Sequence, residues 1–329
     1  MTGPVSASGH RPLAALAAGA CLTILLALPA PVAAQWAGGR YYSQTGHTLD
    51  ARFVAFYDAH GAEAILGYPI TDSFIDPRSG WRIQYLENAR LELASDSASR
   101  RVGVRLAALG EALGGWDPPL AAEQIPAAGD ATCRYYPESG HAVCHAFLDF
   151  YDANGGPALF GYPISEFKLE GDRIVQYFQA FRFDWHPEAK EGPPVRPAPL
   201  GRIHFDRMGY DPALLRPRLP SDPEQYEVLE LRPRVSVRVP IAGADGSQTV
   251  YVVVRDQNLN PVPQATVVLT IHLDGGDRLL LLPPTDARGL SHIDFDYAGQ
   301  RRGFRVELDV TVVRDGLQAL TRDSFLIWY

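Results

Sequence analysis

The sequence predicts a tandem α+β repeat region, with a helix plus a β-hairpin in each unit, followed by an all-β immunoglobulin-like sandwich. Three observations lead to this fold class. First, residues 41–70 and 135–164 are two copies of one stretch, in register at an offset of 94 residues with 15 of 30 positions identical. Second, the spacing of apolar residues along each copy changes from helical to alternating. Third, the chain after Tyr226 consists of short alternating segments separated by turn residues.

Residues 1–34 carry the features of a secretory signal peptide. Arg11 precedes an unbroken apolar run, and Val32-Ala33-Ala34 supplies the small-x-small pattern that signal peptidase recognises. We therefore expect a mature protein that begins at Gln35. The alternatives are an uncleaved anchor and a lipoprotein attached at Cys21. The apolar run, of about 16 residues, is shorter than the roughly 20 that span a bilayer.

Composition and charge narrow the class of protein. Without its leader the chain would keep 295 of its 329 residues, enough for two or three domains. Loss of Arg11 would change the formal net charge from −8 to −9, which disfavours nucleic acid and anionic lipid as partners. No later segment is long and apolar enough to re-enter a membrane. The sequence predicts a secreted or cell-envelope protein, extracytoplasmic and without a membrane span after signal cleavage.

Each copy of the repeat predicts one amphipathic helix that ends in a rigid turn. Apolar residues recur at helical spacing after Thr45 in the first copy and Ser139 in the second, and these hydroxyl residues can serve as N-caps. Gly61 and Gly155 stand where a left-handed residue ends the helix. A Gly-Tyr-Pro turn then leads the chain back across the helix. This turn occupies residues 67–69 and 161–163.

Beyond the turn the apolar period changes to two. Two short strands are predicted in each unit, at 82–86 and 90–93 and again at 174–178 and 182–185. A trailing segment with a Leu-Gly pair follows each hairpin and is expected to pack back. Proline is dense from Pro187 to Pro223, which limits regular structure there. Seven short strands after Tyr226 fit the sandwich. The expected parts are the signal peptide 1–34, repeat unit 1 at 35–120, repeat unit 2 at 121–205, a Pro-rich linker at 206–225 and the sandwich at 226–329.

The paired GH, FYDAxG, GYPI and Q-Y-aromatic segments resemble a repeat found in exported, often multidomain bacterial proteins. The Leu66-Gly67-Tyr68-Pro69 core, with Phe160 replacing leucine in the second copy, is distantly similar to the LGFP repeat, which is linked to cell-wall association. The resemblance covers about residues 40–205. It implies a binding role at the cell wall.

The C-terminal part resembles bacterial immunoglobulin-like domains of the invasin and intimin type. The resemblance rests on Val254-Arg255-Asp256, then on Pro261-Val262-Pro263 with Ala265, and then on Thr285-Asp286-Ala287-Arg288-Gly289 before the strand that ends in Phe295. It implies a spacer or adhesive module and no chemistry.

Histidine and tyrosine recur at matched positions and are candidate binding residues. His47 and His141 are expected in the first helical turn, where a helix N-terminus favours anionic groups. The alternative is a structural histidine whose ring nitrogens bond neighbouring loop carbonyls. Tyr68 and Tyr162 stand in the turn. Their rings are expected either to be exposed for stacking on sugars or to belong to the core with the hydroxyl at its edge.

Arg90 and Arg182 occupy matched positions on the second predicted strand of each hairpin. Each precedes an acid by two residues, Glu92 or Asp184, so strand alternation places the two charges on one face. An ion pair within the unit is one interpretation, and contact with a carboxylate or a sugar is the other. If histidine, tyrosine and arginine converge, each repeat presents an imidazole, an aromatic face and a cation to one ligand.

Cys133 and Cys144 have no cysteine at the equivalent positions of the first copy. In an exported protein, two cysteines eleven residues apart predict a disulfide. A zinc site with His141 and His145 is the alternative, because these histidines would share a helical face. The first copy lacks the second histidine as well as the cysteines, so we expect no metal and no cofactor.

The sequence shows no Gly-rich phosphate loop, nucleophile-elbow serine, HExxH or EF-hand loop. It therefore predicts a secreted, modular protein that is not an enzyme and that binds cell-wall glycan or another surface polymer through its repeats. The alternative is a structural spacer or adhesion protein without a small ligand. An uncharacterised hydrolase comes third, and it would need an acid pair between the repeats.

Overall fold

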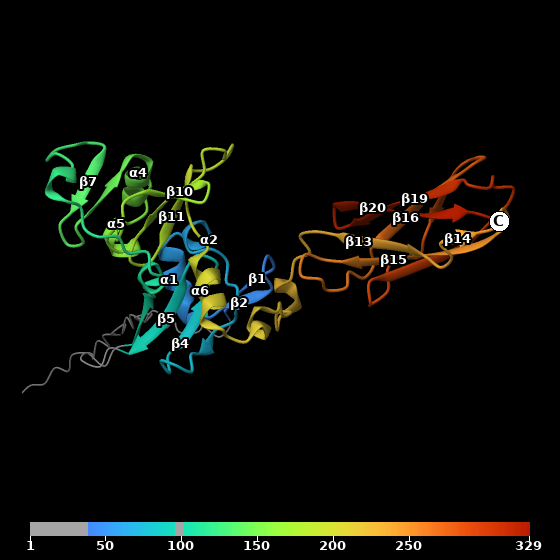
Figure 1. Cartoon of the computed structure of the whole chain (residues 1–329). Helices are drawn as coiled ribbons and strands as arrows, with labels where there is room; N and C mark the ends of the chain where they lie inside the picture. The colour runs from blue at the N-terminus through green and yellow to red at the C-terminus, as the bar shows by residue number, and fades with distance from the viewer. Residues whose placement is uncertain (1–38, 96–101) are drawn as a thin grey trace, which may run out of the picture. The chain divides into compact units, whose positions relative to one another are not determined.

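The computed structural model describes residues 39–95 and 102–329 (Figure 1). The expected signal peptide and its cleavage site lie outside these residues. Among the described helices, none is long and apolar enough to cross a membrane.

Repeat unit 1 contains more regular structure than one helix and one hairpin. It begins with a two-stranded hairpin, continues through two consecutive helices into a four-stranded antiparallel sheet, and ends in a short trailing helix. The elements are β1 (Arg40–Tyr42), β2 (His47–Leu49), α1 (Ala51–Ala59), α2 (Ala62–Ile65), β3 (Phe74–Ile75), β4 (Arg82–Tyr85), β5 (Arg90–Ser95), β6 (Val102–Leu106) and α3 (Leu109–Ala112).

Repeat unit 2 has the same order of elements, again with a sheet of four strands. A single turn of 3-10 helix, Ala122–Gln124, lies between the two units. The elements are β7 (Cys133–Tyr136), β8 (His141–Cys144), α4 (His145–Ala153), α5 (Gly156–Phe160), β9 (Lys168–Glu170), β10 (Arg173–Tyr177), β11 (Arg182–Trp185), β12 (Val195–Pro197) and α6 (Leu200–Met208).

The repeat helices begin later than the sequence predicts. Thr45 and Ser139 lie in the tight turns of the first hairpins, because the glycine after each adopts a positive φ and lets the chain reverse. Asp50 is the N-cap of α1, where its carboxylate accepts the N–H of Arg52. The candidate histidines therefore lie in strands rather than in a first helical turn. At the other end the prediction is confirmed, since Gly61 and Gly155 have φ of +84° and +105°.

The repeats share one hydrophobic core. Its largest side chains are aromatic and come from both units, and it includes Phe53 and Tyr57 of α1 together with Tyr151 of α4. The hydroxyls of the two tyrosines donate to carbonyl oxygens of the Gly-Tyr-Pro turns at 3.1 and 2.7 Å. Each turn is thereby fixed to the buried face of its helix.

The trailing helices are exchanged between the units. Helix α3, at the end of unit 1, packs on the β10–β11 turn of unit 2, and α6 packs on the β4–β5 turn of unit 1. A Cβ at Gly110 would lie 1.9 Å from the carbonyl oxygen of Phe178, and one at Gly201 would lie 1.9 Å from that of Leu86. The Leu-Gly pair of each trailing segment is thus required by a backbone contact across the two repeats.

The C-terminal part is built from two sheets over a separate core. Its architecture is consistent with the predicted immunoglobulin-like sandwich. One sheet has the order β13-β15-β18 and the other β14-β20-β19-β16-β17. The strands are β13 (Arg232–Val237), β14 (Ile241–Ala242), β15 (Gly246–Arg255), β16 (Thr266–Leu273), β17 (Gly276–Leu281), β18 (Leu290–Tyr297), β19 (Arg305–Arg314) and β20 (Leu317–Ile327). The two-residue strand β14 was not predicted and pairs in parallel with β20.

The predicted disulfide between Cys133 and Cys144 is present. The two residues face each other across the β7–β8 ladder. The bond therefore closes the first hairpin of unit 2 just before α4 begins.

Candidate binding clefts of the two repeats

The two candidate histidines are buried, and each faces a carboxylate. His47 and His141 have only 2% and 1% of their surface exposed. Nδ1 of His141 lies 3.1 Å from Oε1 of Glu166, and Nδ1 of His47 lies 3.6 Å from Oδ1 of Asp72. The same carboxylates accept the backbone N–H of the residue after each histidine, at 3.0 and 3.1 Å. Each pair fixes the strand to the segment that follows the Gly-Tyr-Pro turn.

Sequence reasoning missed Asp72 and Glu166. They stand at the same offset of 94 residues as the rest of the copy, each two residues after the isoleucine of GYPI. They differ in residue type, so a comparison by identity passes over them. A comparison of the two copies by charge would have found them, because both side chains are negatively charged.

Tyr68 and Tyr162 are half-buried against the core rather than freely exposed. Their ring centroids lie 5.5 and 5.9 Å from those of Tyr42 and Tyr136. Their backbone N–H groups donate to side chains of the hairpin turn at 3.0 and 2.9 Å. Each tyrosine is still partly exposed, but packing against its neighbouring tyrosine sets the orientation of its ring.

Arg90 and Arg182 form the ion pairs that strand alternation allows. Arg90 contacts Glu92 through Nη2, and Nε of Arg182 lies 2.7 Å from Oδ1 of Asp184. Each guanidinium also donates to a tyrosine hydroxyl of the neighbouring strand, at 3.3 and 3.4 Å. The described contacts give histidine, tyrosine and arginine separate partners instead of one shared centre.

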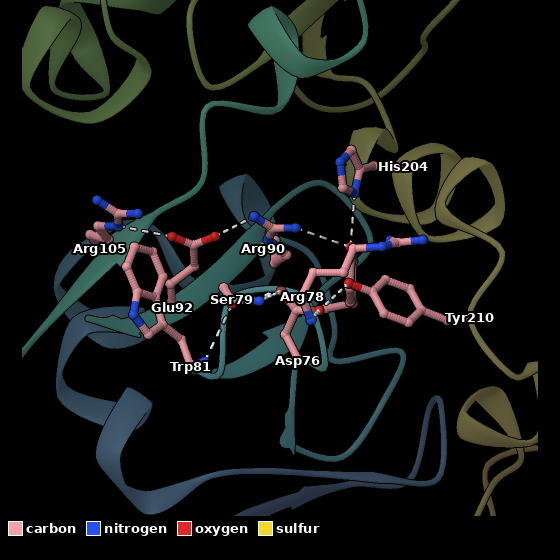
Figure 2. Close-up of polar contacts among 10 residues, drawn as sticks. Asp76, Arg78, Ser79, Trp81, Arg90, Glu92, Arg105, His204 and Tyr210 are labelled. Carbon is pink, nitrogen blue, oxygen red and sulfur yellow. Dashed lines mark hydrogen bonds and ion pairs between the residues drawn. The ribbon is translucent and has the colours of Figure 1, made fainter. Parts of the chain in front are cut away.

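Figure 2 shows the network around Arg90, between the repeat 1 sheet and α6. Glu92, with 3% of its surface exposed, bridges Arg90 and Arg105, whose Nε lies 2.8 Å away. The Tyr85 hydroxyl accepts from Arg90 and donates to Nδ1 of His204 at 2.8 Å. Burial, then the guanidinium charges of Arg90, Arg207 and Arg78, lower the pKa of His204 to about 4. The imidazole is therefore neutral at pH 7 and can accept this hydrogen bond.

A second part of the network holds the chain after α6. Asp76, which is 4% exposed, accepts the hydroxyl of Tyr210 at 2.9 Å and that of Ser79 at 2.6 Å. Arg78 donates to the carbonyl oxygen of Met208 at 2.8 Å and lies over the Tyr210 ring. Because most of these polar groups are paired with one another, the network holds α6 and the chain after it against the repeat 1 sheet.

An open cleft of about 590 Å³ lies at the start of α1 in repeat 1. Its polar side chains form hydrogen bonds with one another, which fix their positions. Asp50 accepts Nε and Nη2 of Arg52 at 2.8 and 2.7 Å and the Ser73 hydroxyl at 2.6 Å. Burial opposes ionisation of Asp50, but these hydrogen bonds prevail and lower its pKa to about 2. The cleft is lined by Gly39, Thr48, Asp50, Ala51, Arg52, Asp72 and Ser73.

A smaller cleft of about 190 Å³ lies at the start of α4 in repeat 2. Phe167 is 44% exposed on its rim, while Trp185 is half-buried and packs against the core below. The ring centroid of His145 lies 6.4 Å from that of Phe167. The cleft is lined by Cys144, His145, Ala146, Phe147, Phe167, Ile174 and Trp185.

The two clefts occupy equivalent places in the repeats but differ in chemistry. Where repeat 1 has the charged or polar residues Asp50, Arg52 and Ser73, repeat 2 has Cys144, Ala146 and Phe167 at an offset of 94. Arg82, which donates to Ser73 at 3.2 Å, is replaced by Ile174. In the described part of the repeats, equivalent backbone positions therefore form a polar cleft in repeat 1 and an apolar cleft in repeat 2.

A buried glutamine supports each cleft. Nε2 of Gln84 donates to the carbonyl oxygens of Thr48 and Thr71, while its Oε1 accepts the N–H of Asp50. Gln176 makes the equivalent two donations at 2.7 and 2.9 Å. Both side chains are fully buried. They tie the first hairpin to the sheet, so the cleft walls are rigid.

No protein-family model and no curated protein matches the chain. Among solved structures, it is similar to the CARDB domain of a Pyrococcus furiosus protein in complex with di-metal ions. The identity is 15%, covering 30% of this chain and 94% of that one, and the TM-score is 0.19. The resemblances to the LGFP repeat and to invasin-type domains stay predictions from the sequence.

Proposed function

We propose that this chain is a secreted, non-catalytic modular protein that binds cell-wall glycan or another surface polymer through its two repeats. The observation that supports this most directly is the pair of clefts at equivalent positions of one folded body. A polymer that reached both clefts would gain from the high effective concentration that the first contact provides for the second.

The polar cleft suits hydroxyl-bearing ligands. Arg52, with 52% of its side chain exposed, and Asp72, with 35%, present a donor and an acceptor at its rim. Arg218 of the linker adds a second guanidinium, with Nη1 3.6 Å from Oδ2 of Asp72. Such mixed polar rims bind neutral or weakly anionic sugars by charge-assisted hydrogen bonds.

The electrostatics of this cleft oppose the hydrolase alternative. A glycosidase needs one carboxylic acid that stays protonated near neutral pH. Burial opposes ionisation of Asp72, but the nearby His47 imidazole and the hydrogen bond from the Thr48 N–H prevail and lower its pKa, as the hydrogen bonds from Arg52 and Ser73 lower that of Asp50. Both carboxylates are therefore ionised, and neither can act as the acid.

The adhesion alternative is supported by the sandwich. Leu279 and Leu281 on the edge strand β17 and Leu320 on β20 are 69%, 69% and 70% exposed. The strand register aligns Leu281 with Leu320 across β16 and β19. An exposed apolar row of this kind suits contact with another macromolecule.

Retention of the mature chain on purified, insoluble peptidoglycan tests the two functions against each other. We expect the double variant Arg52→Ala with Phe167→Ala, which alters both clefts, to lose retention while folding normally. The matched control is Leu281→Ala with Leu320→Ala in the sandwich. Loss of retention in the control but not in the cleft variant would assign binding to the sandwich.

A further inference from the structure

Polymer binding alone does not say which chemical group enters the apolar cleft of repeat 2, but the residues that line this cleft indicate it. None of its seven lining residues carries a carboxylate or a guanidinium. A charged group of a ligand would therefore lose its hydration there without a partner. Phe167 and Trp185 instead supply aromatic surface, and the exposed His145 supplies a ring that can exchange a hydrogen bond at the rim.

The size of the cleft favours one ring rather than a long chain. Its volume of about 190 Å³ is about a third of that of the polar cleft in repeat 1. The cleft is also open at the surface, since Phe167 is 44% exposed. An acyl chain would need a longer, more enclosed slot, whereas a six-membered sugar ring can lie flat on an exposed phenyl face.

The backbone at His145 is a second, independent observation. This residue has φ of +55°, in the left-handed region that residues other than glycine seldom adopt, and its N–H donates to the carbonyl oxygen of Thr132 at 2.7 Å. Its equivalent in repeat 1, Ala51, has no such conformation. Strain of this kind is retained where the surroundings impose it, often at a binding site. Here it follows directly on the disulfide-bonded Cys144 and places the imidazole at the cleft.

The polar cleft of repeat 1 indicates which chemical groups a ligand that contacts both clefts must carry. A polymer that contacts both clefts has to present hydrogen-bonding groups to one and an uncharged apolar face to the other. A pyranose ring has both, because its hydroxyls lie around the edge and its C–H groups lie on the faces. We propose, building on the proposed function, that the repeat 2 cleft is a stacking subsite for one neutral pyranose ring, with its C–H face on Phe167 and Trp185 and a hydroxyl at His145.

The test uses the full mature chain and three insoluble polysaccharides, peptidoglycan, chitin and cellulose. We expect Phe167→Ala to weaken retention roughly tenfold on the polymer that the wild type binds, because it removes one aromatic stacking partner. Phe167→Trp should keep or strengthen retention. Leu169→Ala is the matched control, since this side chain is 69% exposed on the neighbouring strand and lies outside the cleft.

Salt concentration distinguishes the contributions of the two clefts to retention. Retention that depends on Phe167 should persist in 1 M NaCl, where the Debye length falls to about 3 Å, whereas the contribution of Arg52 should decline. A wild type retained on none of the polymers would overturn the proposed function, and this inference with it. A retained wild type matched by Phe167→Ala would overturn the stacking subsite alone. Phe167-dependent binding to phosphatidylglycerol vesicles, without binding to polysaccharide, would assign the cleft to lipid instead.

Discussion

At the scale of single residues, positions that are identical in the two repeats mostly hold the fold. His47 and His141 face carboxylates in closed surroundings, and Gln84 and Gln176 tie hairpins to sheets. Positions that differ between the copies line the clefts, as Ser73 and its equivalent Phe167 do. The two copies therefore share the groups that their common core needs and differ at the positions that line the clefts.

His204 makes the stability of the repeats sensitive to acid. Its pKa falls from about 6.5 to about 4 on folding, so between these values the unfolded chain binds a proton that the folded chain does not. The contribution of neutral His204 to the free energy of unfolding is fully present above pH 6.5. As the pH falls, this free energy decreases by up to about 3 kcal/mol near pH 4. Urea unfolding of wild type and His204→Gln at pH 7.0, 5.5 and 4.5 checks this. Between pH 7.0 and 4.5, the free energy of unfolding should decrease less in His204→Gln than in the wild type. Equal decreases in the two proteins would contradict the lowered pKa of His204.

At the scale of elements, much of the repeat was predictable and the exceptions have physical causes. Strands β4, β5 and β11 begin at the residues where the sequence predicts them. The first hairpins were missed because strands of three or four residues carry little periodicity, and Leu49 fits a helical stripe as well as a strand. The clefts could not be predicted either. Phe167 and Trp185 lie far apart in the sequence, and only the folded sheet brings them beside α4.

The two crossing glycines provide a sharp test of the exchanged helices. Gly110→Ala and Gly201→Ala should each lower the free energy of unfolding by about 3 kcal/mol or more, since a Cβ would overlap backbone oxygen that cannot move independently. Gly103→Ala in β6 is the control, because nothing lies within 4 Å of its Cβ position. Urea denaturation at pH 7 measures the three differences. Glycine variants as stable as the control would mean that α3 and α6 do not make these contacts.

The disulfide should stabilise the first hairpin of unit 2. Cys133 and Cys144 close a short loop, and the chain-entropy model gives about 2 to 3 kcal/mol for this length. Addition of reductant is expected to lower the urea midpoint of the wild type. Reductant should leave Cys133→Ser with Cys144→Ser unchanged, at the lower midpoint. Two free thiols in the denatured, unreduced protein would contradict the bond.

At the scale of the whole molecule, the two repeats share their hydrophobic clusters, and we expect them to fold as one unit. Their aromatic core takes residues from both units, and a second small cluster joins Leu109 of α3 to Leu200 of α6. In each unit, the turn between the two central strands of the sheet is covered by the trailing helix of the other unit. The sandwich has a core of its own, from Leu231 to Ile327.

A cut between the units should not separate them. The segment around Ala127 is exposed and lies between the two sheets in the chain. After cleavage at a protease site inserted there, we expect the two fragments to elute together in size-exclusion chromatography and to part only in denaturant. The uncleaved insertion variant controls for disturbance by the new site. Separation of the fragments in buffer would show that the exchanged helices contribute little.

The exchange of α3 and α6 also bears on ancestry. A precursor with a single unit would have had a trailing helix but no second turn on the same chain to receive it, since each helix caps the turn of the other copy. Two such chains could satisfy each other through a two-fold, swapped dimer. Gene duplication and fusion would then have placed both halves of a homodimer on one chain, where its two formerly identical clefts could diverge.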